Sequence, residues 1–350
     1  LMRDAERTEQ RSNNDQFSKI AHSLPGRIAL LKSTGTASSV ASQWVQVPYL
    51  KPDQRYRGYR ASEWKIENAT ATHIPAETWS QLWFQSPLTG KFEITADRST
   101  FGWGECVISY GMFSAEPRHD AKAIRTIRLM HSASEIETAP NLPEWKNMAA
   151  FRIVVDDRRL TTFTNGVQIH DTAFNAAPSP WIVLQADQPG NECRITNLRI
   201  TGTPEIPDEL DLIDMADWSC WRADIFEESH SFSDNPGSPW RKAGSEIVAR
   251  VLPEGTSTRQ SLLHYQRPML EDGVIEFETF WEPGVTEVHP CVGRSVVMIS
   301  SDAAKLHQLT EAQYESRELA IDNESPIAGA VAPELKLKDW NRIRLSLKGD

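Results

Sequence analysis

Ser-Gln-Leu-Trp-Phe-Gln-Ser-Pro-Leu at residues 80–88 is repeated, with changes, as Ser-Leu-Leu-His-Tyr-Gln-Arg-Pro-Met at residues 261–269. Ser, Leu, an aromatic residue, Gln and Pro recur in the two stretches at identical spacing. Each stretch leads to a glycine, Gly90 or Gly273, and then to residues that alternate between apolar and polar. Alternation with a period of two is typical of a half-buried β-strand. The repeat therefore predicts two related β-rich domains.

The residues that follow the first copy form short strand-like runs separated by turn residues. The clearest turn is Asn165-Gly166, which divides residues 160–169 into two short runs. Asn-Gly favours the positive φ angles of a type I′ turn, so this segment is predicted to be a β-hairpin. Short strands, frequent turns and almost no amphipathic helix indicate an all-β fold of antiparallel sandwiches.

The domain organisation follows from where each copy begins and ends. The second copy has no counterpart of the Asn165-Gly166 hairpin or of the strand-like runs at residues 181–184 and 195–200. We expect the second sandwich to be incomplete, and the polypeptide to continue past Asp350 as part of a larger protein with flanking domains. The predicted domains are a helical segment and linker at 1–60, a first sandwich at 61–203 and a second sandwich at 204–350.

Bulk composition limits the classes of partner. The net charge of −11 argues against a nucleic-acid or anionic-membrane surface, because such a surface needs a basic patch. No run approaches the roughly 20 apolar residues of a membrane-spanning helix. The chain begins with Leu1 rather than Met, so we expect any targeting segment to lie outside it. The compartment stays open, with export to the periplasm or cell surface among the alternatives.

The four cysteines are Cys106, Cys193, Cys220 and Cys291. None belongs to a Cys-x-x-Cys pair, which argues against a structural zinc site. Small buried thiols are the expected state. A disulfide between Cys106 and Cys193 is the alternative if the protein is exported.

Several segments of the second half carry a resemblance to a known family: residues 261–273, 282–290, 306–310 and 340–342, with the join at 195–212. They resemble a family of uncharacterised planctomycete proteins that is described only as a domain of unknown function. The resemblance covers roughly residues 60–350 and implies a concanavalin A-like (laminin G-like) jelly roll, without an activity to transfer. Cys291 departs from the family, where a small residue such as Ala is expected.

One candidate site is a polar cluster in the second half, made of Glu282, Glu287, His289, Arg294 and His307. Glu287 and His289 share one face if their segment is extended, since side chains alternate along a strand. Carboxylate and imidazole together can bind a divalent cation, act as an acid–base pair or hydrogen-bond a sugar. The alternative is a polar network that ties a long loop to the sandwich. We expect no cofactor, with a divalent cation such as calcium as the alternative.

A second candidate is the pair Glu276 and Glu278, which alternates with Ile275 and Phe277. The resemblance matters here, because concanavalin A-like glycosidases use acidic residues at alternating positions of one strand as nucleophile and acid. Any half-buried strand shows the same pattern, with apolar residues inside and charged residues outside. The geometry of this face decides between catalysis and a solvated surface.

Tryptophan supplies the third candidate, since the chain has 12. Trp79, Trp83, Trp103 and Trp181 can form a stacking platform for sugar rings or can pack in the core. Trp103, between Gly102 and Gly104, is the one we expect to be exposed in a binding site.

Three functions remain after these observations. The first is a non-catalytic binding or structural module of a larger protein, recognising a glycan or another protein. The second is a glycoside hydrolase or lyase that uses paired carboxylates. The third is a purely architectural domain that positions a neighbour.

Overall fold

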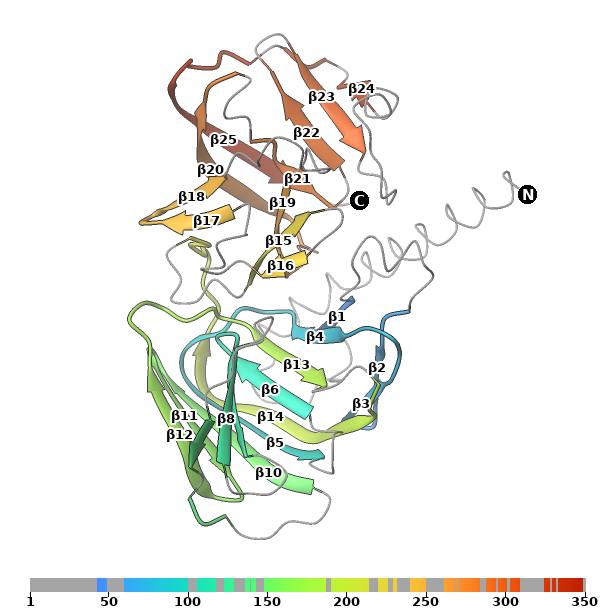
Figure 1. Cartoon of the computed structure of the whole chain (residues 1–350), viewed down its shortest axis with the longest axis vertical. Coiled ribbons are helices and arrows are strands. Elements are labelled where there is room, and N and C mark those ends of the chain that lie inside the picture. Colours follow the sequence, from blue (N-terminus) through green and yellow to red (C-terminus); the bar gives the residue numbers. More distant parts are fainter. Residues whose placement is uncertain are drawn as a thin grey trace, which may run out of the picture. The chain divides into compact units, whose positions relative to one another are not determined.

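The described residues form an all-β structure of antiparallel sheets (Figure 1), as the sequence predicts. Among them no helix is long and apolar enough to cross a membrane. The helix expected before residue 33 lies outside this part of the chain. The computed structural model describes residues 43–48, 60–99, 106–117, 123–128, 136–138, 140–142, 148–186, 190–213, 220–225, 229–231, 240–249, 261–267, 269, 271–283, 288–293, 295–300, 303–308, 324–327, 329–331 and 333–348.

The chain groups into two compact units, which are treated separately below. One unit spans residues 39–267, and the other contains residues 268–350. The domain boundaries expected near residues 60 and 203 stay a prediction. Strands β15 (Trp221–Ile225) and β19 (Ser261–Tyr265), which the sequence places in the second domain, belong to the first compact unit.

The first unit contains a sandwich of two seven-stranded sheets. One sheet has the order β1-β4-β13-β6-β7-β8-β9 and is called the β6 sheet; the other, β12-β11-β10-β5-β14-β3-β2, is called the β5 sheet. Their strands are β1 (Trp44–Pro48), β2 (Glu63–Glu67), β3 (Thr70–Ile74), β4 (Ser80–Phe84), β5 (Thr89–Ser99), β6 (Cys106–Tyr110), β7 (Phe113–Pro117), β8 (Ala123–Arg128), β9 (Ile136–Thr138), β10 (Met148–Asp156), β11 (Arg159–Thr164), β12 (Val167–Ala173), β13 (Ile182–Ala186) and β14 (Cys193–Glu205).

The alternating pattern of the strands builds the core between these sheets. On β5, Phe92 and Ile94 are buried, while Lys91 is exposed and Glu93 only half-buried. Ile108 of β6 belongs to the same buried cluster as Phe92 and Ile94. In Figure 1, β6 and β13 accordingly lie over β5 and β14. Burial of this shared apolar layer is the main force that holds the two sheets together.

Two local features test the sequence analysis directly. Asn165 and Gly166 both have positive φ, and β11 pairs with β12 across them, so the predicted hairpin is confirmed. Strand β1 lies inside the stretch that was expected to be a linker. It is a strand because it pairs with β4. This pairing places Trp44 opposite Phe84, with the edge of one ring toward the face of the other and the centroids 5.2 Å apart.

The outer face of the β6 sheet is also apolar and is covered. Trp83, Trp181 and Val183 form a second buried cluster with Cys220, and Tyr265 packs against it. Tyr265 accepts a hydrogen bond from the Trp181 indole at 2.8 Å. Cys220 and Tyr265 come from the part of the unit that holds the sheet β16-β15-β19, with β16 at Ser229–Ser231, and the hairpin β17 (Trp240–Ala243) and β18 (Glu246–Ala249).

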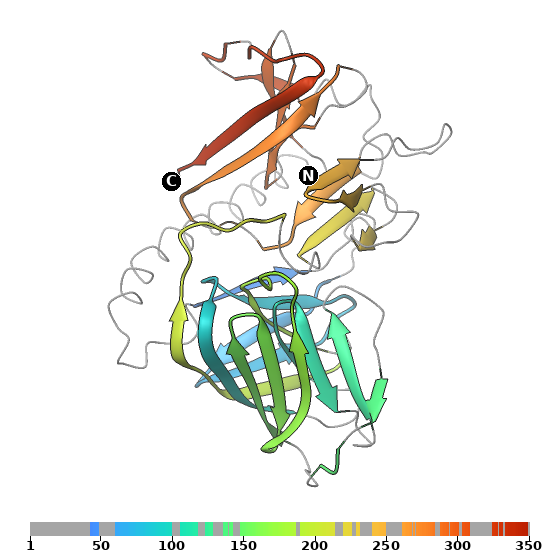
Figure 2. The ribbon, with the colours of Figure 1, turned by 90° about the vertical axis from the view of Figure 1, so that its left-hand side faces the viewer.

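The second unit contains two smaller antiparallel sheets. Strands β20 and β25 form a long two-stranded ribbon, drawn in orange and red in Figure 2. The other sheet has the order β21-β22-β23-β24. The strands are β20 (Gly273–Trp281), β21 (Cys291–Val292), β22 (Ser295–Ile299), β23 (Ala304–Gln308), β24 (Glu324–Pro326) and β25 (Asp339–Leu347).

The repeated stretch makes similar pairings in both places. Trp221 of β15 lies opposite Tyr265 of β19, with ring centroids 5.2 Å apart, as Trp44 lies opposite Phe84. The duplication inferred from the sequence stays a hypothesis. The similarity between the β1–β4 pair and the β15–β19 pair agrees with it.

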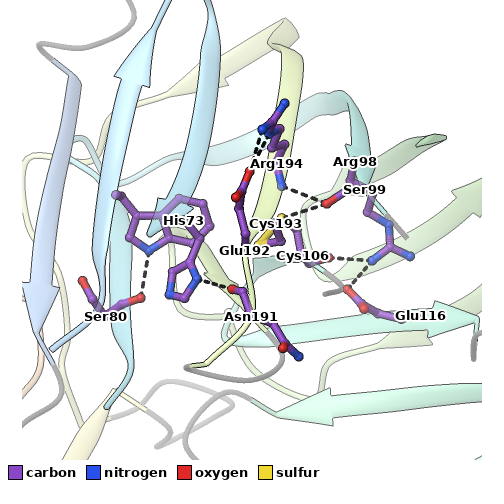
Figure 3. The surroundings of a disulfide bond; sticks show 11 residues. His73, Ser80, Arg98, Ser99, Cys106, Glu116, Asn191, Glu192, Cys193 and Arg194 are labelled. Carbon is purple, nitrogen blue, oxygen red and sulfur yellow. Dashed lines mark hydrogen bonds and ion pairs between the residues drawn. A yellow bond between two sulfur atoms is a disulfide. The ribbon is translucent and has the colours of Figure 1, made fainter. Parts of the chain in front are cut away.

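A disulfide joins the two sheets of the first sandwich. It links Cys106, the first residue of β6, to Cys193, the first residue of β14 (Figure 3). Both cysteines are buried. The disulfide, which was the alternative to two free thiols in the sequence analysis, is therefore the state of Cys106 and Cys193 in the structure. Cys291, expected to be buried, is exposed at the start of the two-residue strand β21.

Candidate functional site

The outer face of the β20–β25 ribbon carries charged and aromatic side chains that contact one another. Alternation turns Ile275 and Phe277 inward, and Glu276 and Glu278 outward. The same alternation on β25 makes Arg342 and Arg344 exposed. The register places Glu278 opposite Arg342, Glu276 opposite Arg344 and Phe280 opposite Trp340.

Glu276 is held by two arginines on this face. Arg342 donates a hydrogen bond from Nη2 to Glu276 Oε2, and Arg344 Nε lies 3.2 Å from Glu276 Oε1. The hydrogen bond from Arg342 is the largest cause that holds the pKa of Glu276 below its usual range. Its carboxylate also raises the pKa of Arg342. The two side chains therefore stay oppositely charged at neutral pH.

Two aromatic rings lie beside this ion pair. Phe280 and Trp340 face each other across the ribbon with ring centroids 5.9 Å apart and planes at 75°. Trp340 keeps 42% of its surface exposed, which is unusual for an indole. An exposed indole next to paired guanidinium and carboxylate groups offers a flat apolar surface together with hydrogen-bond donors and acceptors.

This geometry argues against Glu276 as the general acid of the pair Glu276 and Glu278, whose catalytic role stays a prediction. A glycosidase needs one carboxylic acid with a raised pKa, so that it can protonate the leaving oxygen. The pKa of Glu276 moves in the opposite direction because of Arg342. Its arginine contacts also occupy the oxygens that a nucleophile would use. Glu278 faces Arg342 across the ribbon.

The structure places the predicted polar cluster of the second unit in separate local contacts. Glu282 forms an ion pair with Lys338 at 3.2 Å. His289 accepts a hydrogen bond at Nδ1 from the Ile299 backbone at 3.2 Å, and its ring lies against Trp281. His307 is buried on β23, opposite Val296 of β22 and Glu324 of β24.

No group of three or more His, Cys, Asp or Glu side chains within the described ranges is placed to hold a metal ion. Glu287 and Arg294, the other members of the predicted cluster, lie outside those ranges, as does Trp103. A role in ligand binding for all of these residues stays a prediction. The contacts of Glu282 and His289 agree with the alternative of a polar network around the ribbon.

The tryptophans considered as a platform are mostly structural. Trp83 and Trp181 are buried in the cluster under Cys220, and Trp79 is half-buried before β4. Among the described tryptophans the exposed indole is instead Trp340, which the sequence analysis used only as part of the family resemblance. Trp340 alternates with Arg342 and Arg344, which places the three side chains on one face of a strand. The sequence did not show that this strand pairs with the one that carries Glu276.

Two family models match adjacent parts of the chain. Residues 152–246 match a family described as "Protein of unknown function (DUF1581)". Residues 254–350 match "Domain of unknown function (DUF1583_N)". The expected resemblance to families of unknown function is confirmed, and the planctomycete origin stays a prediction. A search of curated protein sequences gave no significant match.

Solved structures show partial similarity to the chain. A sialidase aligns over 47% of this chain and 17% of its own length, with 13% identity and a TM-score of 0.33. The carbohydrate-binding module CBM66 from Bacillus subtilis aligns over 46% of this chain and 96% of its own, with 8% identity and a TM-score of 0.33. The galectin LEC-6 of Caenorhabditis elegans aligns over 40% of this chain and 96% of its own, with 9% identity and a TM-score of 0.27. At these scores, the function has to be argued from the geometry of this chain.

Proposed function

We propose that the chain is a non-catalytic binding module and that a glycan is its ligand. The observation that carries the proposal is the exposed Trp340 ring beside the ion pair of Glu276 and Arg342 on the open face of the β20–β25 ribbon. The site requires no metal ion and no proton transfer.

The chemistry of this face matches the chemistry of a sugar. The apolar faces of pyranose rings stack on aromatic surfaces, and an indole is the largest such surface among side chains. Sugar hydroxyl groups both donate and accept hydrogen bonds. Arginine supplies only donors, and an ionised glutamate supplies only acceptors, so the two together satisfy both halves of a hydroxyl.

A glycan array tests the proposal. The chain is expected to bind a restricted set of glycans, and Trp340→Ala is expected to weaken binding about tenfold, the factor that corresponds to loss of one aromatic contact. Val331→Ala is the matched control, because Val331 is an exposed apolar side chain outside the ribbon. It is expected to bind as the unmodified chain does.

Two results would contradict the proposal. The first is no binding to any glycan by the unmodified chain, which would favour a purely architectural role. The second is binding that Trp340→Ala leaves unchanged. His289→Ala, assayed on the same array, separates the ribbon from the predicted histidine cluster, since a loss with His289→Ala alone would move the site there.

A further inference from the structure

The first sandwich presents the same arrangement on the equivalent pair of strands. On β25, Arg342 lies opposite Glu278 and reaches diagonally to Glu276. On β10, Arg152 lies opposite Thr95 of β5 and reaches diagonally to Glu93, with Nη1 3.6 Å from Oε1. Both glutamates lie three residues after the glycine that follows the repeated stretch, Gly90 or Gly273. The match thus extends from sequence position to side-chain contact.

An aromatic ring accompanies the arginine in both units, although a different strand supplies it. The Arg152 guanidinium lies over the ring of Phe163 on β11, 4.0 Å from the centroid. Register places Phe163 directly beside Arg152 on the outer face of the β5 sheet. A guanidinium stacked on an aromatic ring is oriented and partly desolvated, which leaves its N–H groups directed sideways toward a ligand.

The outer face of the β5 sheet, which carries Arg152 and Glu93, is the open face of the first sandwich. The outer face of the β6 sheet is covered by residues such as Cys220 and Tyr265. On the β5 sheet, the side chains of Glu93 and Arg152 remain 39% and 41% exposed. A ligand can therefore reach the β5 sheet, whereas the opposite face of the sandwich is used for internal packing.

We propose that Glu93, Arg152 and Phe163 form a second glycan site, and that both sites take neutral glycans. The inference rests on the proposed function. The class of glycan follows from charge. Arg152 is paired with Glu93, and the two charges of Arg342 and Arg344 are balanced by Glu276 together with Glu278, which lies opposite Arg342. A paired arginine keeps donors for hydroxyl groups but has no uncompensated charge to attract a uronate or sulfate group.

Titration calorimetry on the full chain tests both the number of glycan sites and the preference for neutral glycans. The probes are cellohexaose, xylohexaose and mannohexaose, with hexagalacturonate as the anionic comparison. At least one neutral hexasaccharide is expected to bind at two sites per chain. Arg152→Gln and Trp340→Ala are each expected to weaken one site about tenfold and to leave the other unchanged, and the double variant is expected to weaken both sites. Arg152→Gln keeps most of the stem length, and Phe163→Leu provides a second variant of the same site.

Lys65→Gln is the matched control. Lys65 is an exposed, ion-paired cation on β2, at the edge of the β5 sheet. Its loss is expected to leave two sites. Circular dichroism of each variant checks that the sheets are retained, and Phe163→Leu replaces Arg152→Gln if the latter unfolds.

The outcomes separate this inference from the proposed function. Complete loss of binding in Trp340→Ala would overturn the second site and leave the proposed function intact. Loss in Arg152→Gln, with no change in Trp340→Ala, would support the site on the first sandwich and contradict the one on the ribbon. Tighter binding of hexagalacturonate than of the neutral probes would overturn the class of ligand. No binding of any probe here or on the array would overturn both proposals.

Discussion

At the scale of single residues, His73 shows how burial sets the charge of a side chain. Its ring is buried next to Trp64, and Nδ1 donates a hydrogen bond to the Asn191 carbonyl at 2.7 Å (Figure 3). Burial lowers the pKa of His73 from its ordinary value of 6.5, although the hydrogen bond opposes this shift. The imidazole is therefore neutral in the folded protein at neutral pH.

The lowered pKa of His73 predicts a loss of stability in acid. Below pH 6.5 the unfolded chain binds a proton that folded His73 resists, so the free energy of unfolding falls from there down toward the folded pKa. Above pH 6.5 the residue contributes no pH dependence. Urea unfolding at pH 7.5 and pH 5 measures the difference, and His73→Gln is expected to reduce it. An equal reduction in His264→Gln, a change at an exposed histidine, would contradict this assignment.

Arg98 and Glu116 form a buried ion pair in the first sandwich. Their atoms Nη1 and Oε1 are 2.7 Å apart, and their side chains are 2% and 0% exposed. Arg98 also donates a hydrogen bond to the Cys106 carbonyl, which ties the pair to the start of β6 (Figure 3). Neither charge has access to water, so each depends on the other.

Removing one partner of this pair is expected to be costly. Glu116→Ala leaves a buried guanidinium without its carboxylate, and the free energy of unfolding is expected to fall by about 3–5 kcal/mol. The double variant Arg98→Met with Glu116→Leu removes both charges and is expected to recover most of the loss. Guanidinium unfolding of the two variants measures this; a double variant as unstable as the single one would contradict it.

At the scale of elements, the disulfide joins strands that lie far apart in sequence. Cys106 and Cys193 are separated by 87 residues, and they connect β6 of one sheet to β14 of the other. A loop of this size has a large entropy in the unfolded chain, and closing it is expected to stabilise the sandwich by about 4–5 kcal/mol.

Thiol counting tests the disulfide without any substitution. In denaturant without reductant, iodoacetamide is expected to label Cys220 and Cys291 only, since these are the free cysteines. After reduction all four cysteines should react. Mass spectrometry reads both numbers, and four labels before reduction would show that the bond is not formed. Loss of thermal stability on reduction is the accompanying result.

The elements that the sequence predicted well are those with local signals. Alternation after Gly90 predicted the strand that the structure places at Thr89–Ser99. The Asn-Gly dipeptide predicted the turn at residues 165–166, where both residues have positive φ. Strand β1 was missed because residues 33–60 are rich in Ser, Thr, Gln and Arg, and because the strand that it pairs with, β4, is distant in sequence. Local chemistry carries no information about such a partner.

The candidate site was predicted only in part for the same reason. The outward alternation of Glu276 was visible in the sequence, but its contacts with Arg342 and Arg344 join residues more than 60 positions apart. These arginines hold the pKa of the glutamate below its usual range, which is opposite to what a general acid needs. Register across a sheet, rather than composition, decides this chemistry.

At the scale of the whole molecule, each unit buries some sheet faces and leaves others open. In the first unit, Trp83, Trp181 and Cys220 turn the outer face of the β6 sheet into a second core. This cover could not be predicted from the repeat, because it comes from residues such as Cys220 and Tyr265, which the repeat assigns to the next domain. Packing over such distances depends on the shape of both surfaces.

The burial of the inter-sheet disulfide limits when the bond can form and when it can be reduced. Its two sulfurs lie in the core, with the cysteines 0% and 1% exposed, and thiol–disulfide exchange requires a thiolate to reach a sulfur directly. Reductant in the surroundings of the finished protein therefore acts on the bond only through opening of the sandwich. The same burial slows oxidation in the folded protein, so the two thiols join most readily while the sheets are still assembling, in whatever redox environment surrounds the chain at that moment. An intact bond in isolated protein would then report mainly on the environment in which the chain folded, and only slowly on its later surroundings.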